Sequence, residues 1–144
     1  MSQPVFIHLR LHSEYSISDG MVRVDEAIAA AHSDAMPALA ITDLNNFFCL
    51  VKFYRSARGS GVKPIMGCDV FITNDTDSER PYRMLLLCQS REGYLLLCQL
   101  ISRAFLENQH RGRAELRREW FQQLGTTGLI ALSGGHLGDV GCAL

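Results

Sequence analysis

The chain has 144 residues, 47% of them hydrophobic and 20% charged, which suits one soluble globular domain with a substantial core. Its 14 basic and 15 acidic side chains leave a net charge of −1, so no whole-molecule field attracts nucleic acid or another polyanion. No basic segment followed by a long apolar stretch opens the chain and no apolar run reaches the length of a bilayer, so we expect a cytoplasmic protein without membrane contact.

Strand and helix patterns alternate through the first half of the chain. Residues 6–11 are rich in apolar side chains and are followed by turn-forming residues, which predicts a strand. Residues 26–35 are rich in alanine with apolar side chains at helical spacing, and Asp25 and Glu26 place negative charge at the end that the helix dipole favours. Residues 38–42 (ALAIT) then predict a buried strand.

A second helix and a third strand follow. Asn45 or Asn46 can cap a helix over residues 47–58, and the glycines of GSG mark its end. Residues 63–72 (KPIMGCDVFI) predict the third strand. The order strand, helix, strand, helix, strand favours parallel pairing with right-handed crossovers. We therefore predict an α/β fold in which mostly parallel strands alternate with helices.

The second half of the chain continues with further strands and helices. After a polar loop, the patterns predict a strand at 83–88, a helix at 92–107, a short helix around Trp120 and a strand at 129–132, before the start of another helix. The sequence LLLCQ occurs twice, once in a strand pattern and once in a helix pattern, so we interpret the repeat as a coincidence of core composition. Residues 103–118 are rich in arginine but also contain glutamates, which favours a solvated helix-loop-helix surface over a nucleic-acid track.

Five cysteines are spread along the chain without any C-x-x-C pair. Four of them lie within or beside apolar runs, so we expect small buried thiols in a reducing compartment. No Ser-His-Asp or Cys-His arrangement can be assembled with any specificity, and the stretches GSG and SGGHLG lack the spacing of a phosphate-binding loop.

Side chains that can bind metal follow or end the predicted strands. His12 follows the first strand, Asp43 follows the second, Asp69 lies in the third, and Asp19 lies in the loop after the first. The carboxyl ends of parallel strands meet at one edge of a sheet, so these groups could converge, and an imidazole with carboxylates suits Zn²⁺ or Mn²⁺. Since such aspartates are also common turn residues and an isolated histidine is often structural, spacing alone leaves a structural role open.

Motifs along the whole chain resemble a known family. In order, they are HLRLHSEYSISDG, PALAITDLNNFFCLVKFY, GVKPIMGCDVF, REGYLLLCQLIS and LIALSGGHLGDVG. Together they resemble the start of the alpha subunits of bacterial DNA polymerase III, a family of replicative polymerases that begin with a PHP domain. The resemblance implies that residues 1–144 are the N-terminal part of a PHP domain, which is a distorted, TIM-like β/α barrel that can hold a cluster of metals. The palm, fingers and later domains of such subunits would lie outside these residues.

The metal-binding pattern of that family is only partly matched. Its His-x-His motif has Arg10 in the first place and His12 in the second, and the acid that follows corresponds to Asp19. Its Thr-Asp-His motif reads TDL, which keeps Asp43 but replaces the histidine by leucine. The acid after KPIMGC is Asp69. A late Asp-x-His pair of the family would fall beyond the last residue of this sequence.

Arginine also replaces a later ligand histidine of the family, at Arg83. A guanidinium stays protonated near neutral pH and offers a metal no lone pair, whereas it forms charge-assisted hydrogen bonds with carboxylates. We therefore expect a vestigial site, free of metal and without catalytic residues, in which Arg10 and Arg83 neutralise Asp19, Asp43 or Asp69. The alternative is that both arginines point into solvent.

The resemblance further implies that the parent protein is an enzyme, a DNA-directed DNA polymerase that extends primers in chromosome replication with Mg²⁺ held by the acids of its palm. The PHP region would need no cofactor and would serve structure and the docking of the separate proofreading exonuclease subunit, alongside other holoenzyme subunits, with DNA bound mainly by other domains. The alternative is an active metal-dependent phosphoesterase, such as a pyrophosphatase or a PHP exonuclease.

Because the predicted strands do not close a barrel, we expect an isolated piece to self-associate through open strand edges.

Overall fold

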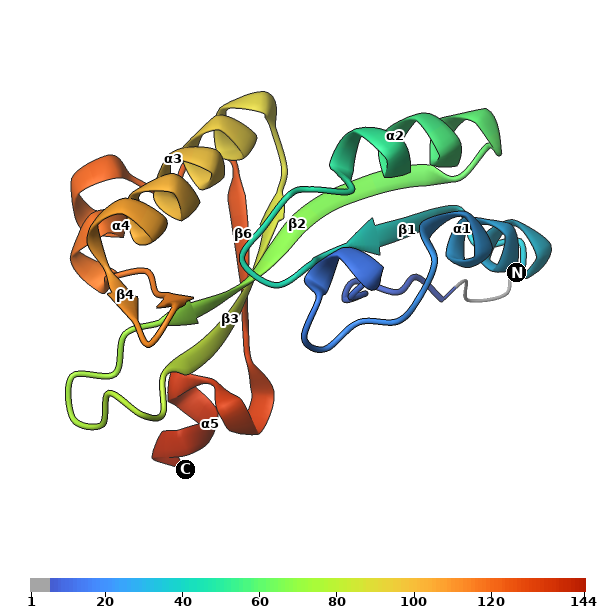
Figure 1. Ribbon diagram of the computed structural model, residues 1–144. Helices are drawn as coiled ribbons and strands as arrows, with labels where there is room; N and C mark the ends of the chain where they lie inside the picture. The colour runs from blue at the N-terminus through green and yellow to red at the C-terminus, as the bar shows by residue number, and fades with distance from the viewer. Residues whose placement is uncertain (1–5) are drawn as a thin grey trace. The chain divides into compact units, whose positions relative to one another are not determined.

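The computed structural model describes residues 6–144, which form a mixed α/β structure (Figure 1). The chain divides into two compact units between Cys68 and Asp69. The helices are α1 (Val24–Ser33), α2 (Leu50–Gly59), α3 (Arg91–Glu107), α4 (Arg118–Leu124) and α5 (Asp139–Ala143), with 3₁₀ turns η1 (Glu14–Ser16) and η2 (Gly135–Leu137). The strands are β1 (Ala38–Ile41), β2 (Lys63–Ile72), β3 (Tyr82–Cys88), β4 (Gln109–His110), β5 (Arg113–Ala114) and β6 (Leu129–Ser133).

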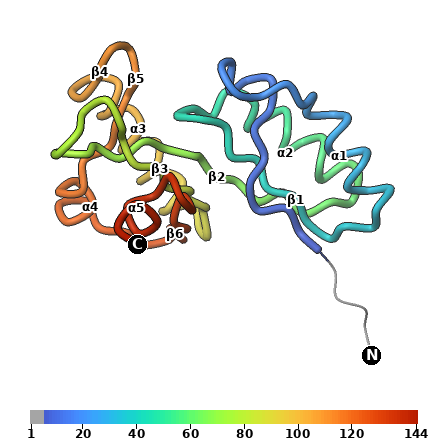
Figure 2. Tube along the Cα trace, turned by 90° about the horizontal axis from the view of Figure 1, so that it is seen from below, coloured from blue at the N-terminus to red at the C-terminus, as the bar shows by residue number. Residues whose placement is uncertain are grey.

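A parallel strand pair with two helices forms the first unit. β1 pairs with the first half of β2, with Ala38 opposite Lys63 and Ile41 opposite Met66. Helices α1 and α2 pack against each other (Figure 2). They bury apolar side chains at helical spacing, namely Val24, Ile28 and Ala31 of α1 and Leu50, Phe53 and Ala57 of α2. The predicted strand-helix-strand order is confirmed here, and β2 has the predicted bounds.

The predicted strand over residues 6–11 is wrong, although this segment lies beside β1. The amide of Ala40 donates to the His8 carbonyl (3.0 Å), and the amide of Thr42 donates to the Leu11 carbonyl (2.9 Å). The amide of Leu11, however, donates to the side-chain hydroxyl of Thr42 (2.9 Å). Because a side chain takes the place of a backbone carbonyl, the ladder is interrupted and the segment stays irregular.

Helix α2 begins three residues later than the sequence predicts, at Leu50, and neither asparagine caps it. The Asn46 side chain instead accepts from the amide of Phe48 (3.1 Å) and donates to the Leu44 carbonyl (3.0 Å). Asn45 adopts a left-handed backbone with φ 54°. The asparagines therefore build the tight turn that leads into the helix, which is the alternative use of this residue type.

The second unit contains antiparallel strands, which the sequence did not predict. Its strand order is β2-β3-β6, and β3 runs antiparallel to β6, with Met84 opposite Ser133 and Cys88 opposite Leu129. The prediction of mostly parallel strands is therefore wrong for this half, while the bounds of β3, α3, α4 and β6 agree with the sequence to within a few residues. Residues 6–144 form no closed barrel.

The direction of β6 follows from a close backbone contact at its start. Just after β3, the amide of Gln89 donates to the carbonyl of Gly128 (2.8 Å). Gly93, in the first turn of α3, packs so closely on Gly128 that a Cβ on Gly93 would collide with that carbonyl. The start of β6 is thus held beside the end of β3, so β6 has to run back along it.

A small hairpin replaces part of the predicted helix-loop-helix surface. β4 and β5 pair in antiparallel fashion across a two-residue turn formed by Arg111 (φ 50°) and Gly112 (φ 78°). Two successive residues with positive φ are typical of the turns that close tight hairpins, and glycine is favoured at such positions. In residues 6–144, no helix combines the length and apolar character needed to cross a bilayer.

Candidate metal centre

The candidate metal ligands fall into the two units. His12, Asp19 and Asp43 belong to the first, and Asp69 belongs to the second together with Arg83. Arg10 lies in the first unit, exposed on the irregular segment before η1.

Asp43 is almost completely buried, with 2% of its surface exposed, two residues beyond the end of β1. Its oxygen Oδ1 accepts from the amide of Ser13 (2.6 Å) and the hydroxyl of Ser16 (2.9 Å). Its other oxygen, Oδ2, accepts from the hydroxyl of Ser13 (2.8 Å) and the thiol of Cys49 (2.9 Å). These donors offset the cost of burying a carboxylate, because hydrogen bonds to the charged form stabilise it.

The turn that supplies the serines is itself held in place locally. Ser13 caps η1, since its hydroxyl accepts from the amide of Tyr15 (3.2 Å). The amide of Glu14 donates to the carbonyl of Val22 (2.9 Å), which closes the loop back on itself. Gly20 approaches the carbonyl of Ser13 so closely that a Cβ there would collide with it. The serines of HSEYSISDG are thereby fixed around Asp43.

Cys49 is a donor in this cluster and not a nucleophile. The pKa of its thiol is raised to about 12, mainly by burial and then by the hydrogen bond to Asp43 and the charge of that carboxylate. A thiol with so high a pKa stays protonated near neutral pH, and only the thiolate is reactive. Spacing rules singled out neither the cysteine nor the two serines; the S-x-x-S pattern directly after His12 was the available signal.

His12 and Asp19 form a pair at the surface of the same unit. Imidazole Nδ1 of His12 lies 3.0 Å from Oδ2 of Asp19, and the two side chains are 11% and 37% exposed. A carboxylate on one ring nitrogen fixes the orientation of an imidazole, both in metal sites and in ordinary structural pairs. His12 and Asp19 are thus brought together in this unit as an ion-pair contact, whereas Asp43 is surrounded by other donors.

Asp69 is paired with Arg83 in the second unit. Nη2 of Arg83 lies 2.8 Å from Oδ2 of Asp69, and the two side chains are 13% and 2% exposed. The same guanidinium lies over the ring of Phe71, 4.7 Å from its centroid. Asp69 and Phe71 are two residues apart on β2, so their side chains leave the same face of the strand and both reach Arg83 on β3.

A second guanidinium, from Arg113, also lies over Phe71, 5.3 Å from the centroid. Arg113 forms an ion pair with Glu115 (2.8 Å), whose side chain is 4% exposed. This part of residues 103–118 is therefore packed against β2, and the prediction of a solvated surface is wrong for it. Arg113 and Glu115 occupy alternate positions, as in a strand, which was the missed signal.

These donor sets fit a divalent cation poorly. At Asp69, a cation would have to share the carboxylate with a permanently charged guanidinium. At Asp43, four hydrogen-bond donors already surround the oxygens. Within the part of the chain that the structure describes, no group of three or more histidine, cysteine, aspartate and glutamate side chains is arranged to hold a metal ion.

Known proteins share both the sequence and the fold. The chain is 45% identical over 145 residues to DNA polymerase III subunit alpha of Neisseria meningitidis (strain Z2491), and 41% identical over 144 residues to that of Escherichia coli (strain K12). Each alignment covers 100% of this chain but only 13% and 12% of the relatives, so the chain spans a small part of their length.

Among solved structures, a metal-dependent phosphoesterase from Bifidobacterium adolescentis matches with a TM-score of 0.54 and 12% identity, over 73% of this chain and 35% of that one. At this identity the likeness shows the fold alone. Residues 8–144 match the PHP domain family. The resemblance inferred from the motifs is thereby confirmed, and the chain belongs to the PHP domain family.

Proposed function

We propose that this chain is the PHP region of a replicative DNA polymerase alpha subunit and that its metal chemistry has been lost. The parent activity is template-directed DNA synthesis, with Mg²⁺ held by acids of a palm domain. Support comes from the 41–45% identity to DNA polymerase III alpha subunits over the whole of this chain. The PHP region then acts as a structural module and as a docking module for the proofreading exonuclease subunit.

The ion pair between Arg83 and Asp69 is the observation that carries the proposed loss of metal. The arginine stands where the family has a ligand histidine, and it supplies permanently the positive charge that a metal would otherwise bring. The buried carboxylate is therefore compensated without a cation. Arg10, the other arginine in place of a ligand, is assigned the same neutralising role in this proposal.

Metal content and hydrolysis test this role together. The chain is purified, incubated with Zn²⁺ and Mn²⁺, desalted, and analysed by mass spectrometry for bound metal and with p-nitrophenyl phosphate for turnover. We expect substoichiometric metal and no turnover above buffer, with a metal-dependent phosphatase as positive control. Stoichiometric metal with turnover would contradict the proposal and favour the metal-dependent phosphoesterase alternative.

The docking role has a test of its own. The exonuclease subunit from the same organism is mixed with the purified chain and the mixture is separated by size-exclusion chromatography. Co-elution at a shifted volume is expected, with serum albumin in place of the chain as a control for non-specific association. Separate elution of the two proteins at micromolar concentration would contradict exonuclease docking and leave the metal question unaffected.

A further inference from the structure

Basic residues without acidic residues between them are concentrated in the second half of the first unit, residues 44–68. The acidic residues described there all lie between Glu14 and Asp43, whereas residues 44–68 carry basic residues and no acid. Those basic residues are Lys52, Arg55, Arg58 and Lys63. Helix α2 carries the first three and the fourth begins β2, so a single helix and the strand after it concentrate the positive charge of this segment.

Not all of that charge is compensated. The ammonium of Lys52 lies 3.1 Å from Oδ2 of Asp25 on α1, an ion pair that accounts for one cation. Within residues 6–144, no carboxylate forms an ion pair with Arg55, Arg58 or Lys63. These three cations therefore remain available to an external anion.

Apolar side chains are exposed next to these cations. Val51 is 64% exposed and Tyr54 is 39% exposed, although both lie on a helix whose opposite side is buried. Val51, Tyr54 and Arg58 are spaced three and four residues apart, so they share one stripe of the helix. We call this stripe, together with Arg55 and Lys63, the α2 face.

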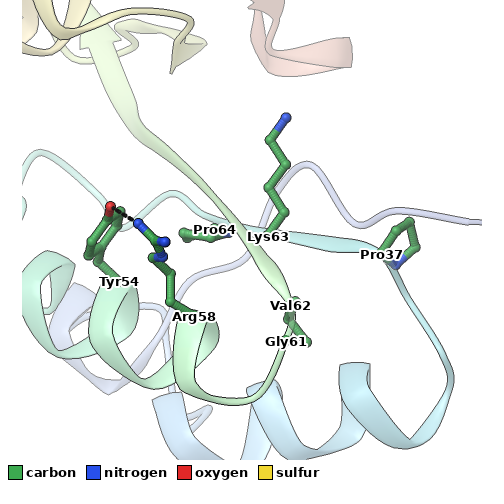
Figure 3. Close-up of a pocket in the computed structure, with 7 residues that line it drawn as sticks. All are labelled: Pro37, Tyr54, Arg58, Gly61, Val62, Lys63 and Pro64. Carbon is green, nitrogen blue, oxygen red and sulfur yellow. Dashed lines mark hydrogen bonds between the residues drawn. The ribbon is translucent and has the colours of Figure 1, made fainter.

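A pocket of about 460 Å³ opens beside the α2 face, where α2 ends and β2 begins (Figure 3). Its lining includes the polar residues Tyr54, Arg58 and Lys63 and the apolar residues Pro37, Val62 and Pro64, and Figure 3 shows the Lys63 side chain extending away from Arg58 at the rim. Figure 3 shows Arg58 turned toward Tyr54, and its Nη1 donates to the Tyr54 hydroxyl at 3.0 Å. The guanidinium also lies 5.7 Å from the centroid of that ring. The arginine is thus oriented before any ligand arrives, which lowers the entropic cost of binding.

The composition of the pocket favours one class of ligand. Carboxylates suit the arginine and the lysine, and apolar side chains suit the proline, valine and tyrosine surfaces. A nucleic acid strand would require a longer track of cations matched to successive phosphates, whereas this pocket offers one arginine and one lysine. We propose that the α2 face docks an acidic peptide segment of a partner protein, anchored by apolar side chains. This inference is independent of the proposed polymerase role, because it concerns a surface of the purified chain alone.

Fluorescence anisotropy with a short fluorescein-labelled peptide of alternating glutamate and leucine tests the proposal. We expect saturable binding that weakens as salt is raised, since exposed charge pairs are screened. In the double variant Arg58→Glu, Lys63→Glu, attraction becomes repulsion at two positions, and the affinity should fall about tenfold or more. The control is Arg23→Glu, which makes one such charge reversal at an exposed position at the start of α1, and its affinity should be unchanged.

Circular dichroism of each variant verifies that the fold is intact. We expect it to be intact because the substituted positions are exposed. Equal binding by wild type and the double variant would overturn the proposal, and so would the absence of saturable binding. Tighter binding of an oligothymidylate of the same net charge would overturn it in favour of a nucleic-acid surface. Sedimentation that shows self-association lost in the double variant would overturn it in favour of a second copy of the chain.

Discussion

Asp43 in the first unit and Asp69 in the second are both buried acids that the sequence pattern predicted as metal ligands, yet they are stabilised by different means. Asp43 accepts hydrogen bonds from neutral groups, namely the amide and hydroxyl of Ser13, the hydroxyl of Ser16 and the thiol of Cys49. Asp69 is paired with the charged guanidinium of Arg83. A buried carboxylate is therefore stabilised in two physically distinct ways in this chain, by neutral donors at Asp43 and by a guanidinium at Asp69.

The difference has consequences for substitution. Removing one neutral donor around Asp43 costs one hydrogen bond among several. Removing the guanidinium at Asp69 leaves a buried charge without its cation, and that penalty is larger than the net value of the pair. The two units should accordingly differ in how sharply stability responds to the loss of a partner.

The largest effect is expected for Arg83→Leu. The substitution leaves the carboxylate of Asp69 buried without the guanidinium, and the free energy of unfolding should fall by about 3 to 5 kcal/mol. Urea unfolding followed by the fluorescence of Trp120, which is buried in the second unit and is the only tryptophan of the chain, measures the loss. The double variant Asp69→Leu, Arg83→Leu should recover most of it, because no uncompensated charge remains. If the double variant were less stable than Arg83→Leu, the ion pair would not be the cause.

A smaller loss of stability is expected at Asp43, whose hydrogen-bond donors are neutral. Asp43→Asn keeps the size of the side chain but turns an NH₂ group toward donors from Ser13 or Ser16, and the cost should be about 2 kcal/mol. Thermal unfolding followed by far-UV circular dichroism is suitable, since the described part of the first unit has no tryptophan. Asp34→Asn, at the exposed end of α1, is the matched control and should change stability by less than about 0.5 kcal/mol. Equal effects of the two substitutions would mean that the donors around Asp43 contribute nothing.

Local sequence patterns predicted the helices and strands better than they predicted the contacts of the candidate site. The bounds of β2 and the alternation of strands and helices up to it follow from apolar runs and turn residues. The pairing of a ligand-replacing arginine with one of the acids follows from charge, and Arg83 with Asp69 is such a pair. The donors around Asp43 could not be predicted, because a tertiary turn brings the serines to a carboxylate about 30 residues away. The antiparallel pairing of β6 with β3 is accompanied by a close approach of Gly93 to Gly128, a tertiary contact that leaves no trace in hydrophobic periodicity.

The thiol of Cys49 beside Asp43 should make the stability of the chain depend on pH in the alkaline range. Its pKa is raised in the folded chain, from 9.0 to about 12, mainly by burial and then by Asp43. The folded state therefore holds its proton where the unfolded state has lost it, so this contribution to stability is complete below pH 9 and declines as the pH rises to about 12.

Cys49→Ser keeps a donor for Asp43 without a group that titrates in this range. The variant should lose stability less steeply with pH than wild type, as measured by urea unfolding at successive pH values between 9 and 12. Cys88→Ser is the matched control in the second unit, where burial raises the pKa of the thiol to about 11. Cys88→Ser should change the slope of the free energy of unfolding against pH only up to about pH 11, a lower limit than for Cys49→Ser. Identical slopes for wild type and Cys49→Ser would contradict the role of the thiol as a buried donor.

The smallest effect is expected at the pair of His12 and Asp19 in the first unit, whose aspartate is partly exposed. Asp19→Asn removes the charge beside His12 but keeps a group that can accept a hydrogen bond from its Nδ1. Since Asp19 is 37% exposed, water compensates much of the loss, and the free energy of unfolding should fall by no more than about 1 kcal/mol. Urea unfolding at low and high salt measures the change, and the difference between wild type and variant should shrink at high salt because the charge is screened. If Asp19→Asn lowered the free energy of unfolding as much as Asp43→Asn does, the burial of an acid would not determine how much its loss costs in this unit. The pair of His12 and Asp19 would then contribute as much to stability as the donors around Asp43.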